Sequence, residues 1–430
     1  MLNAFRVACI GLAWFGANAA IGDTPVRSNV DQIARAIEDN YFDAARGRQI
    51  ATDLRTAATS GAFDKLTDNR DLATALSDRL KPLDRHFTIT WSADAAPLPR
   101  MRERPESPRP QTDPQRRSNY GIRRVEVQPG NIGYIDLRSF AGFEFGKSDQ
   151  PGRQAMEAAL QLVSASDALI IDLRNNGGGS PAMVGYLSSA FTPKGADIYN
   201  TFHYRNGTAS EAPTDWYAKP RLDTPLYILV NARTGSAAEA FAYTMKNARR
   251  ATVVGEASAG AANPGDFVDA GNGFRVFVST GSPINPISKK NWEGDGVIPD
   301  VTVASAAAFD TAKALALENV LKQNRPESEK TDARWALEAL RAEAAPPSGV
   351  RIEDYLGSYG ALQIGQDNGQ LFMRRGRRPP TMLLPLGNDT FSAAAESGTR
   401  VVFERGGDRK VTAFEMKSSD GPSSRHRRDE

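Results

Sequence analysis

Cysteine is nearly absent from this chain of 430 residues and histidine is scarce, which narrows the chemistry available to it. The single cysteine, Cys9, has no second cysteine with which to form a disulfide inside the chain. The three histidines are His86, His203 and His426, and no H-E-x-x-H motif or Cys/His cluster accompanies them. The sequence therefore argues against a metalloenzyme, and we expect neither a metal site nor an organic cofactor.

Neither sign of charge dominates the sequence. Lysine and arginine together number 53 and aspartate and glutamate 51, which gives a formal net charge of +2. A protein that binds nucleic acid or a membrane surface through its overall charge carries a larger basic excess. We therefore expect no nucleic-acid partner.

The sequence also has no hydrophobic run of typical membrane-spanning length, but its first 19 residues have the features of a secretion signal. Arg6 supplies the positive start, "VACIGLAWFGA" the apolar core, and Ala17-Asn18-Ala19 a small-residue cleavage site. The apolar run is shorter than a transmembrane helix requires. These features predict a signal peptide over residues 1–19 and a periplasmic or secreted protein with no integral membrane segment after signal removal.

The N-terminal part of the chain carries a helical pattern. Val30, Ile33 and Ile37 recur at helical spacing, and later leucines repeat the pattern, which predicts a helical N-terminal cap domain over residues 28–95. Residues 96–118 contain six prolines and six arginines, a composition typical of a linker.

The rest of the chain divides into three further parts. Between residues 120 and 305 apolar runs alternate with helix-like segments, which indicates an α/β core. Residues 306–345 read as a helical connector, and short apolar runs separated by Gly, Asp and Asn predict a small all-β domain over residues 346–425. We expect the last eight residues, "SSRHRRDE", to be frayed, with His426 among them.

Two polar corners interrupt the core. In "LVNARTGSAAEAF", Ser236 is followed three residues later by Glu239, the S-x-x-E pattern of a capping box at a helix start. In "DLRNNGGGSPA", three glycines lie between a predicted strand and a predicted helix. They are compatible with a plain turn, with a weak G-x-G-x-x-A dinucleotide fingerprint, or with backbone N–H donors for an oxyanion.

Three separated motifs in the same order resemble one protein family. "DALIIDLRNNGGGSPAMVGYL", "PLYILVNARTGSAAEAFAYTM" and "NWEGDGVIPDV" are similar to the tail-specific (C-terminal-processing) serine proteases, nearest to the branch of the tricorn protease core and the interphotoreceptor retinoid-binding protein repeats. The resemblance covers about residues 120–305, extends weakly to "DRHFTI", and does not reach the β domain. It implies a crotonase/ClpP-like α/β core.

The resemblance also implies an exported serine peptidase acting on peptides or unfolded proteins. The serine of the family's S-A-x-E motif falls on Ser236, which would attack a peptide carbonyl. The N–H groups of Ala237 and Gly178 would then hold the oxyanion, with Gly177 as the alternate glycine donor.

The usual general bases of the family are missing. The lysine that tail-specific proteases place 25 residues after the serine is Ala261 here, and the tricorn histidine position is Asp136. His86, in "DRHF", resembles a D-x-H-L motif of the retinoid-binding-protein branch and is the best candidate base. His203 is a second candidate for the base. The alternative interpretation of His86 is a structural one, in which the histidine packs at a domain junction and takes no part in catalysis.

Glu293 matches an acidic residue near the active site of the tricorn core. It would orient a histidine or form a hydrogen bond in the site, unless it is an ordinary loop carboxylate. Because both usual bases are absent, a second function stays open, a non-catalytic binding protein for a peptide or an apolar ligand on the same scaffold.

Overall fold

The computed structural model describes residues 25–94, 114–393, 396–419 and 421–430. The signal peptide predicted over residues 1–19 and most of the predicted linker lie outside these ranges. The chain divides into two compact units, Met1–Arg104 with Gly265–Ser279, and Pro105–Pro264 with Thr280–Glu430. We call them the N-terminal unit and the second unit.

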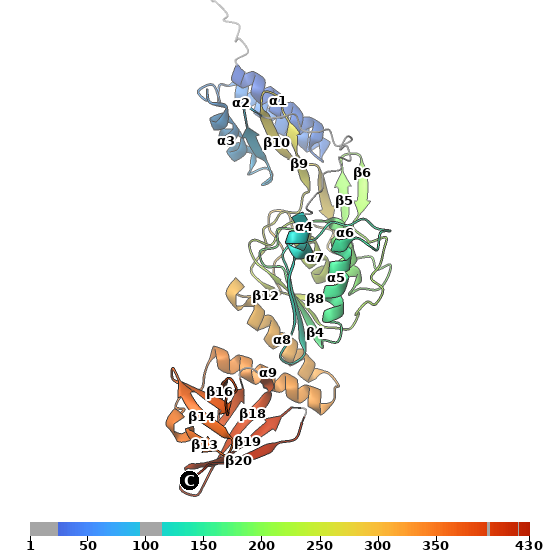
Figure 1. The fold of residues 1–430 in the computed structure, drawn as a ribbon. Coiled ribbons are helices and arrows are strands. Elements are labelled where there is room, and N and C mark those ends of the chain that lie inside the picture. Colours follow the sequence, from blue (N-terminus) through green and yellow to red (C-terminus); the bar gives the residue numbers. More distant parts are fainter. Residues whose placement is uncertain (1–24, 95–113, 394–395, 420) are drawn as a thin grey trace, which may run out of the picture. The chain divides into compact units, whose positions relative to one another are not determined.

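Three helices and a small sheet make up the N-terminal unit (Figure 1). The helices are α1 (Pro25–Asn40), α2 (Ala44–Thr59) and α3 (Asn69–Leu80), and the sheet has the order β1 (Thr88–Trp91), β10 (Phe274–Ser279), β9 (Gly265–Asp269). The predicted helical spacing is confirmed, because Val30, Ile33 and Ile37 are fully buried. Asp43 and Asp68 cap α2 and α3 by accepting backbone N–H groups.

Residues 265–279 belong to the N-terminal unit, whereas the sequence interpretation placed them in the core. Thr88 of β1 pairs with Phe277 of β10, and Phe274, Val276 and Val278 have no exposed surface. Alternating apolar residues predict a half-buried strand but do not specify which sheet the strand joins. The sequence pattern therefore could not assign this hairpin to its unit.

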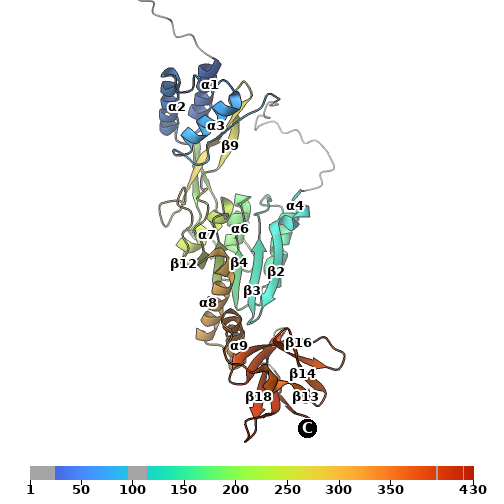
Figure 2. The same ribbon diagram turned by 90° about the vertical axis from the view of Figure 1, so that its left-hand side faces the viewer.

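A six-stranded sheet forms the centre of the second unit, and Figure 2 shows three of its strands, β4, β3 and β2, side by side. Its order is β12 (Val301–Thr302), β8 (Ala251–Gly255), β7 (Leu226–Val230), β4 (Ala168–Asp172), β3 (Ile132–Leu137), β2 (Ile122–Gln128). Only the β2–β3 pair is antiparallel. Every residue of β3, β4 and β7 is buried, as expected for parallel strands covered on both faces.

Helices cover the two faces of this sheet. One core contains residues of α5 (Pro151–Leu162), α6 (Pro181–Ser189) and α7 (Ala237–Asn247), and a separate core contains residues of α8 (Ala308–Lys322) and α9 (Glu327–Ala344). The short helix α4 (Pro114–Arg117) precedes β2. A three-stranded sheet has the order β11 (Gly281–Ile284), β5 (Thr201–Tyr204), β6 (Gly207–Ser210). The predicted α/β core is confirmed.

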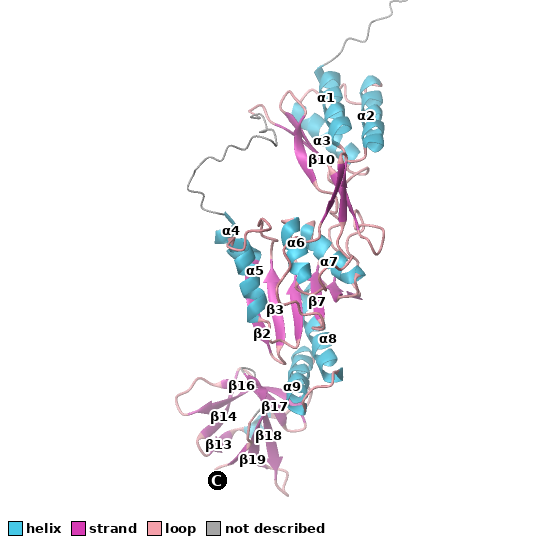
Figure 3. Ribbon diagram, turned by 90° about the vertical axis from the view of Figure 1, so that its right-hand side faces the viewer, coloured by secondary structure: helices cyan, strands magenta, loops and turns pink. Residues whose placement is uncertain are grey.

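Eight antiparallel strands, paired in sequence order, form the C-terminal β domain (Figure 3). They are β13 (Gly357–Tyr359), β14 (Leu362–Asp367), β15 (Gln370–Arg375), β16 (Thr381–Gly387), β17 (Thr390–Ala393), β18 (Glu396–Arg405), β19 (Val411–Ser418) and β20 (Ser424–Arg427). The sheet almost closes on itself, because Asp429 N donates to Ser358 O at 2.8 Å. The predicted all-β domain is therefore confirmed.

The expectation of a frayed C-terminus is wrong. Residues 424–427 pair with β19, and the His426 ring lies 5.0 Å from the Phe414 ring, centroid to centroid. The ring contact and the strand pairing hold a segment whose polar composition predicted disorder.

Among the described residues, none of the helices has the length and apolar character needed to cross a membrane.

Candidate active site

Ser236 occupies a sharp corner between a buried strand and a helix. It follows β7, immediately precedes α7, and its side chain is exposed. Its φ of 52° and ψ of −123° lie outside the regions that non-glycine residues ordinarily adopt. Such backbone strain costs on the order of 1–3 kcal/mol and persists only where the surrounding structure holds it. A strained strand-to-helix corner that exposes a serine hydroxyl is the geometry of a nucleophile elbow.

The carboxylate of Glu239 holds this corner from inside the protein. Its side chain is fully buried, and Oε2 accepts the Ser236 N–H at 2.8 Å, so the predicted capping box is present. The same carboxylate accepts Ser258 Oγ at 2.5 Å, Gly260 N at 2.7 Å and Ala261 N at 2.9 Å. One buried charge thus ties the serine backbone to the 258–261 segment.

The start of α7 supplies a backbone donor beside Ser236. Ala237 is the first residue of the helix, and the described residues provide no acceptor for its N–H group. Such orphan N–H groups and the helix dipole make a helix N-terminus favourable for negative charge. The Ala237 N–H is therefore suited to stabilise an oxyanion formed next to Ser236.

The glycine-rich turn packs directly against the same corner. A Cβ atom built on Gly178 would lie 2.7 Å from Ser236 Cβ and 3.0 Å from Ala237 N. Only glycine permits this approach at the Gly178 φ of 111°. The turn is also bonded to the corner, since Gly235 N donates to Asn176 O at 2.9 Å. The structure thus brings together Ser236, Ala237 and Gly178, and their catalytic roles stay a prediction.

The N–H group of Gly178, however, already has an acceptor. It donates to Asn176 Oδ1 at 2.8 Å, and the buried Asn176 side chain in turn donates from Nδ2 to Leu137 O at 2.9 Å. Gly177 is exposed, and the described residues give its N–H group no acceptor. In this conformation the N–H group of Gly177, the alternate donor, has no acceptor among the described residues, whereas that of Gly178 is already bonded.

His86 lies in the N-terminal unit and is held by an aspartate that the sequence interpretation did not single out. The Nδ1 atom of His86 lies 3.0 Å from Asp84 Oδ1, and the His86 backbone N–H donates to the same oxygen at 2.9 Å. Because a carboxylate only accepts hydrogen bonds, the Nδ1 atom of His86 carries a proton. The D-x-H spacing was the signal that could have identified Asp84.

Asp84 is itself fixed as a buried anion. Its Oδ2 accepts Ser279 Oγ at 2.7 Å and Tyr41 Oη at 3.1 Å. Burial alone raises the pKa of Asp84, but the hydrogen bonds from His86 and Ser279 outweigh it and hold the pKa below its ordinary value. An ionised carboxylate behind Nδ1 stabilises an imidazolium, which is the state a histidine base reaches after accepting a proton.

The other candidate bases have different surroundings. Asp136 is buried and ion-paired, with Oδ1 2.6 Å from Arg138 Nε and Oδ2 3.3 Å from Arg123 Nε, so it serves as a structural anion. His203 is exposed in β5, in the three-stranded sheet. Ala261 contributes only its backbone N–H, to Glu239.

Glu293 anchors a loop of the second unit. Its Oε2 accepts the N–H groups of Ala262 and Asn263 at 2.8 and 3.0 Å, and its own N–H donates to Asn291 Oδ1 at 3.0 Å. These bonds fix the backbone just before the chain enters β9. Glu293 thus holds this loop, and its proposed role at the active site stays a prediction.

Comparisons with known proteins agree on the central part of the chain. A family model described as Peptidase family S41 matches residues 131–303. The chain is 28% identical over 180 residues to the carboxyl-terminal-processing protease of Synechocystis, covering 41% of this chain and 39% of that protein. It is 26% identical over 186 residues to carboxyl-terminal-processing peptidase 1, chloroplastic, of Arabidopsis thaliana, covering 42% and 35%. The chain thus spans about two fifths of the curated relatives it matches.

Two solved structures of low sequence identity align with this chain at TM-scores below 0.5. A putative peptidase from Parabacteroides merdae gives a TM-score of 0.47 at 18% identity, covering 68% of this chain and 97% of that one. The photosystem II D1 C-terminal processing protease gives a TM-score of 0.40 at 17% identity, covering 66% and 94%.

Proposed function

We propose, from the premise that residues 131–303 form a peptidase family S41 domain, that the protein is a serine peptidase whose nucleophile is Ser236. The observation that carries the proposal is the geometry of the corner: an exposed hydroxyl on a strained turn, beside the Ala237 N–H and packed against the glycine turn. Its substrate is a peptide or an unfolded protein, and its location is periplasmic or secreted.

The reaction is acyl transfer. Ser236 Oγ attacks the carbonyl carbon of a peptide bond, and the carbonyl oxygen becomes an oxyanion that accepts the N–H groups of Ala237 and of a glycine in the turn. Collapse of this intermediate expels the amine and leaves an acyl-enzyme, which water then hydrolyses. Gly177 N–H is available at once, whereas Gly178 N–H must first leave Asn176 Oδ1.

His86 is the general base in this proposal. An imidazole ordinarily titrates near 6.5, so at neutral pH it can accept the serine proton and return it to the leaving amine. The Asp84 carboxylate orients the imidazole ring through Nδ1, and Nε2 is the nitrogen that we propose as the proton acceptor. Glu293 takes part by holding the 262–263 backbone, and any direct role in orienting the histidine is part of the proposal.

A fluorophosphonate probe tests the nucleophile. The parent protein should label, and Ser236→Ala should neither label nor cleave a peptide, with a loss of about 0.5–2 kcal/mol in stability because a cap is removed. Ser164→Ala, at an exposed serine after α5, is the control and should label like the parent. Peptide cleavage by Ser236→Ala at the parent rate would refute the assignment. A parent protein that fails to label would favour the alternative function, a non-catalytic binding protein. This alternative rests on the absence of the family's usual bases, because Ala261 and Asp136 stand at their positions.

The pH profile of kcat/KM tests the base. It should rise through a single group near 6 to 7, as expected for an imidazole base. His86→Ala should flatten this limb and lower the rate by orders of magnitude, whereas His203→Ala, at an exposed histidine, should change neither. An unchanged profile in His86→Ala would remove His86 from the mechanism.

A further inference from the structure

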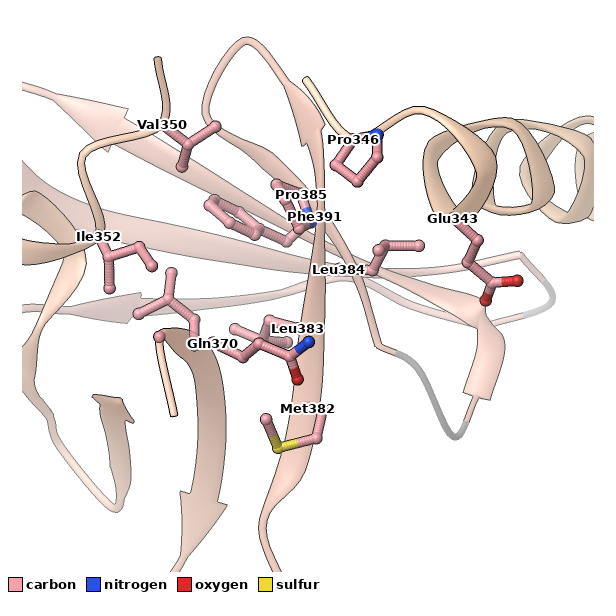
Figure 4. A pocket seen from close by; sticks show the side chains of 12 residues that line it. Glu343, Pro346, Val350, Ile352, Gln370, Met382, Leu383, Leu384, Pro385 and Phe391 are labelled. Atoms are coloured by element: carbon pink, nitrogen blue, oxygen red, sulfur yellow. The ribbon is translucent and has the colours of Figure 1, made fainter. Parts of the chain in front are cut away.

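The C-terminal β domain contains an apolar cavity of about 300 Å³ (Figure 4). Its walls come from β15, β16, β17, the end of α9 and the segment that leads from α9 into the domain. The lining residues are Glu343, Pro346, Val350, Ile352, Gly369, Gln370, Leu371, Met382, Leu383, Leu384, Pro385 and Phe391. Glu343 and Gln370 are the polar side chains of this set, and the others are apolar or glycine.

The cavity is large enough for a small apolar ligand. A cavity of about 150 Å³ in a protein core already binds benzene, and pockets for small ligands begin near 300 Å³. Small sheets that close on themselves commonly hold one such ligand. The apolar lining predicts that the buried part of the ligand is a hydrocarbon.

A cluster of arginines lies on the turn that joins two of the lining strands. Arg375 ends β15, and Arg377 and Arg378 follow in the turn before β16. All three are exposed. Like charges held this close repel one another unless an anion or salt screens them.

Met382 in β16 is the first cavity-lining residue that follows the cationic turn in the chain. Phe372 of β15 lies directly opposite Met382 of β16, and Met382 lines the cavity. The guanidinium of Arg374 lies over the Phe372 ring, 5.7 Å from its centroid. Because a strand rises about 3.3 Å per residue, Arg378 is at most about 13 Å along the chain from Met382. A hydrocarbon in the cavity and a cation at the turn are thus separated by the length of a medium alkyl chain.

We propose that this hairpin binds a single-chain amphiphile with an anionic head, its alkyl chain in the cavity and its carboxylate at the arginines. Arginine is suited to the head because its planar fork donates two parallel hydrogen bonds to a carboxylate. The one carboxylate in the lining, Glu343, comes from α9 and not from the hairpin, so the head faces the turn. This site is independent of Ser236 and of the proposed peptidase activity.

Isothermal calorimetry with three probes of equal chain length tests the proposal on the full chain, below the concentration at which each probe forms micelles. Dodecanoate should bind saturably at one site per chain. Dodecanol should bind at least about tenfold more weakly because it lacks the charge, and dodecylamine should bind weakest because the arginines repel it. Equal binding of the acid and the alcohol, or no saturable binding of dodecanoate, would overturn the proposal.

Two variants separate the head contacts from the chain contacts. Arg377→Gln combined with Arg378→Gln should weaken dodecanoate binding about tenfold and remove the preference for the acid over the alcohol. Arg116→Gln combined with Arg117→Gln removes the same charge from exposed positions in α4 and should leave binding unchanged. An equal loss in both double variants would show a general charge effect and refute the site.

Leu384→Trp should fill part of the cavity and weaken all three probes together. Phospholipid vesicles distinguish a free amphiphile from a membrane. Sedimentation of the protein with anionic vesicles in the absence of dodecanoate binding would replace the proposed ligand by a lipid surface, and so would also overturn it.

Discussion

Replacing Glu211 by glutamine tests whether the second unit contains a carboxyl group that stays protonated at neutral pH. Glu211 follows β6 and is buried, and Asn200 Nδ2 donates to its Oε2 at 2.7 Å. Burial raises the pKa of Glu211 to about 8, against the smaller lowering effect of the Asn200 hydrogen bond. The folded protein therefore holds a proton that the unfolded chain releases at an ordinary value of 4.5.

The sign and size of the effect follow from this difference in pKa. Between pH 4.5 and 8 the folded state binds more protons than the unfolded state, so Glu211 contributes stability that is complete below pH 4.5 and is lost as pH rises through about 8. The slope is about 1.4 kcal/mol per pH unit, which gives about 3 kcal/mol between pH 5 and 7.5 as an upper value. Glutamine keeps an oxygen for Asn200 and does not titrate.

Hydrogen exchange of the β4 and β7 amides measures this effect in the second unit alone, with parent and Glu211→Gln compared at equal pH. The variant should gain stability relative to the parent as pH rises, whereas Glu144→Gln, at an exposed carboxylate, should show no such trend. A constant difference from pH 5 to 7.5 would refute the protonated carboxyl. Asn200 Nδ2 also donates to Thr244 Oγ1 of α7 at 3.1 Å, so this amide links Glu211 to the helix that begins beside Ser236.

Three further substitutions test the proposed site. Glu239→Gln should lower the free energy of unfolding by about 2–4 kcal/mol, because the amide group cannot accept hydrogen bonds from all four donors. An unchanged melting temperature would show that the Glu239 carboxylate does not stabilise the corner. Gly178→Ala should reduce fluorophosphonate labelling about tenfold or more, because the added methyl group crowds Ser236. Gly146 also has a positive φ but has open space around it, so Gly146→Ala should label like the parent. Equal labelling of the two variants would refute the close packing of Gly178 against Ser236. Asp84→Asn should lower kcat by about a hundredfold or more with little change in KM, since an amide can hold the wrong histidine tautomer, and a loss under about tenfold would exclude Asp84 from this role.

The sequence predicted the parts of the molecule that local pattern specifies. The alternation of apolar runs gave the α/β core, and the S-x-x-E spacing identified the Ser236 corner with its Glu239 cap. The all-β domain also followed from its short apolar runs separated by Gly, Asp and Asn. Each of these features depends on residues a few positions apart, where periodicity and capping rules apply directly.

The features that were missed depend on contacts between distant segments. The hydrogen bond that Asp84 accepts from Ser279 joins residues far apart in the chain, and no local sequence pattern predicts such a bond. The acceptor for Gly178 N–H is the side chain of Asn176, and only a folded turn shows which way an amide side chain points. The pairing of His426 in β20 likewise depends on β19. Sequence periodicity carries no information about partners of this kind.

The sheet of the N-terminal unit combines an early strand of the chain, β1, with a late one, β10. The ribosome must therefore synthesise most of the second unit's core before this sheet can be completed. β1 pairs with β10, so the contact between Thr88 and Phe277 closes a loop of about 190 residues, a separation typical of late-forming contacts. A nascent chain that ends before Gly265 already contains both His86 and Ser236. It lacks the hairpin that completes the sheet, and it lacks the Ser279 hydroxyl that bonds to Asp84. In the proposed mechanism, the hydrogen bonds that hold Asp84 behind His86 are therefore complete only after the Ser236 corner has been synthesised.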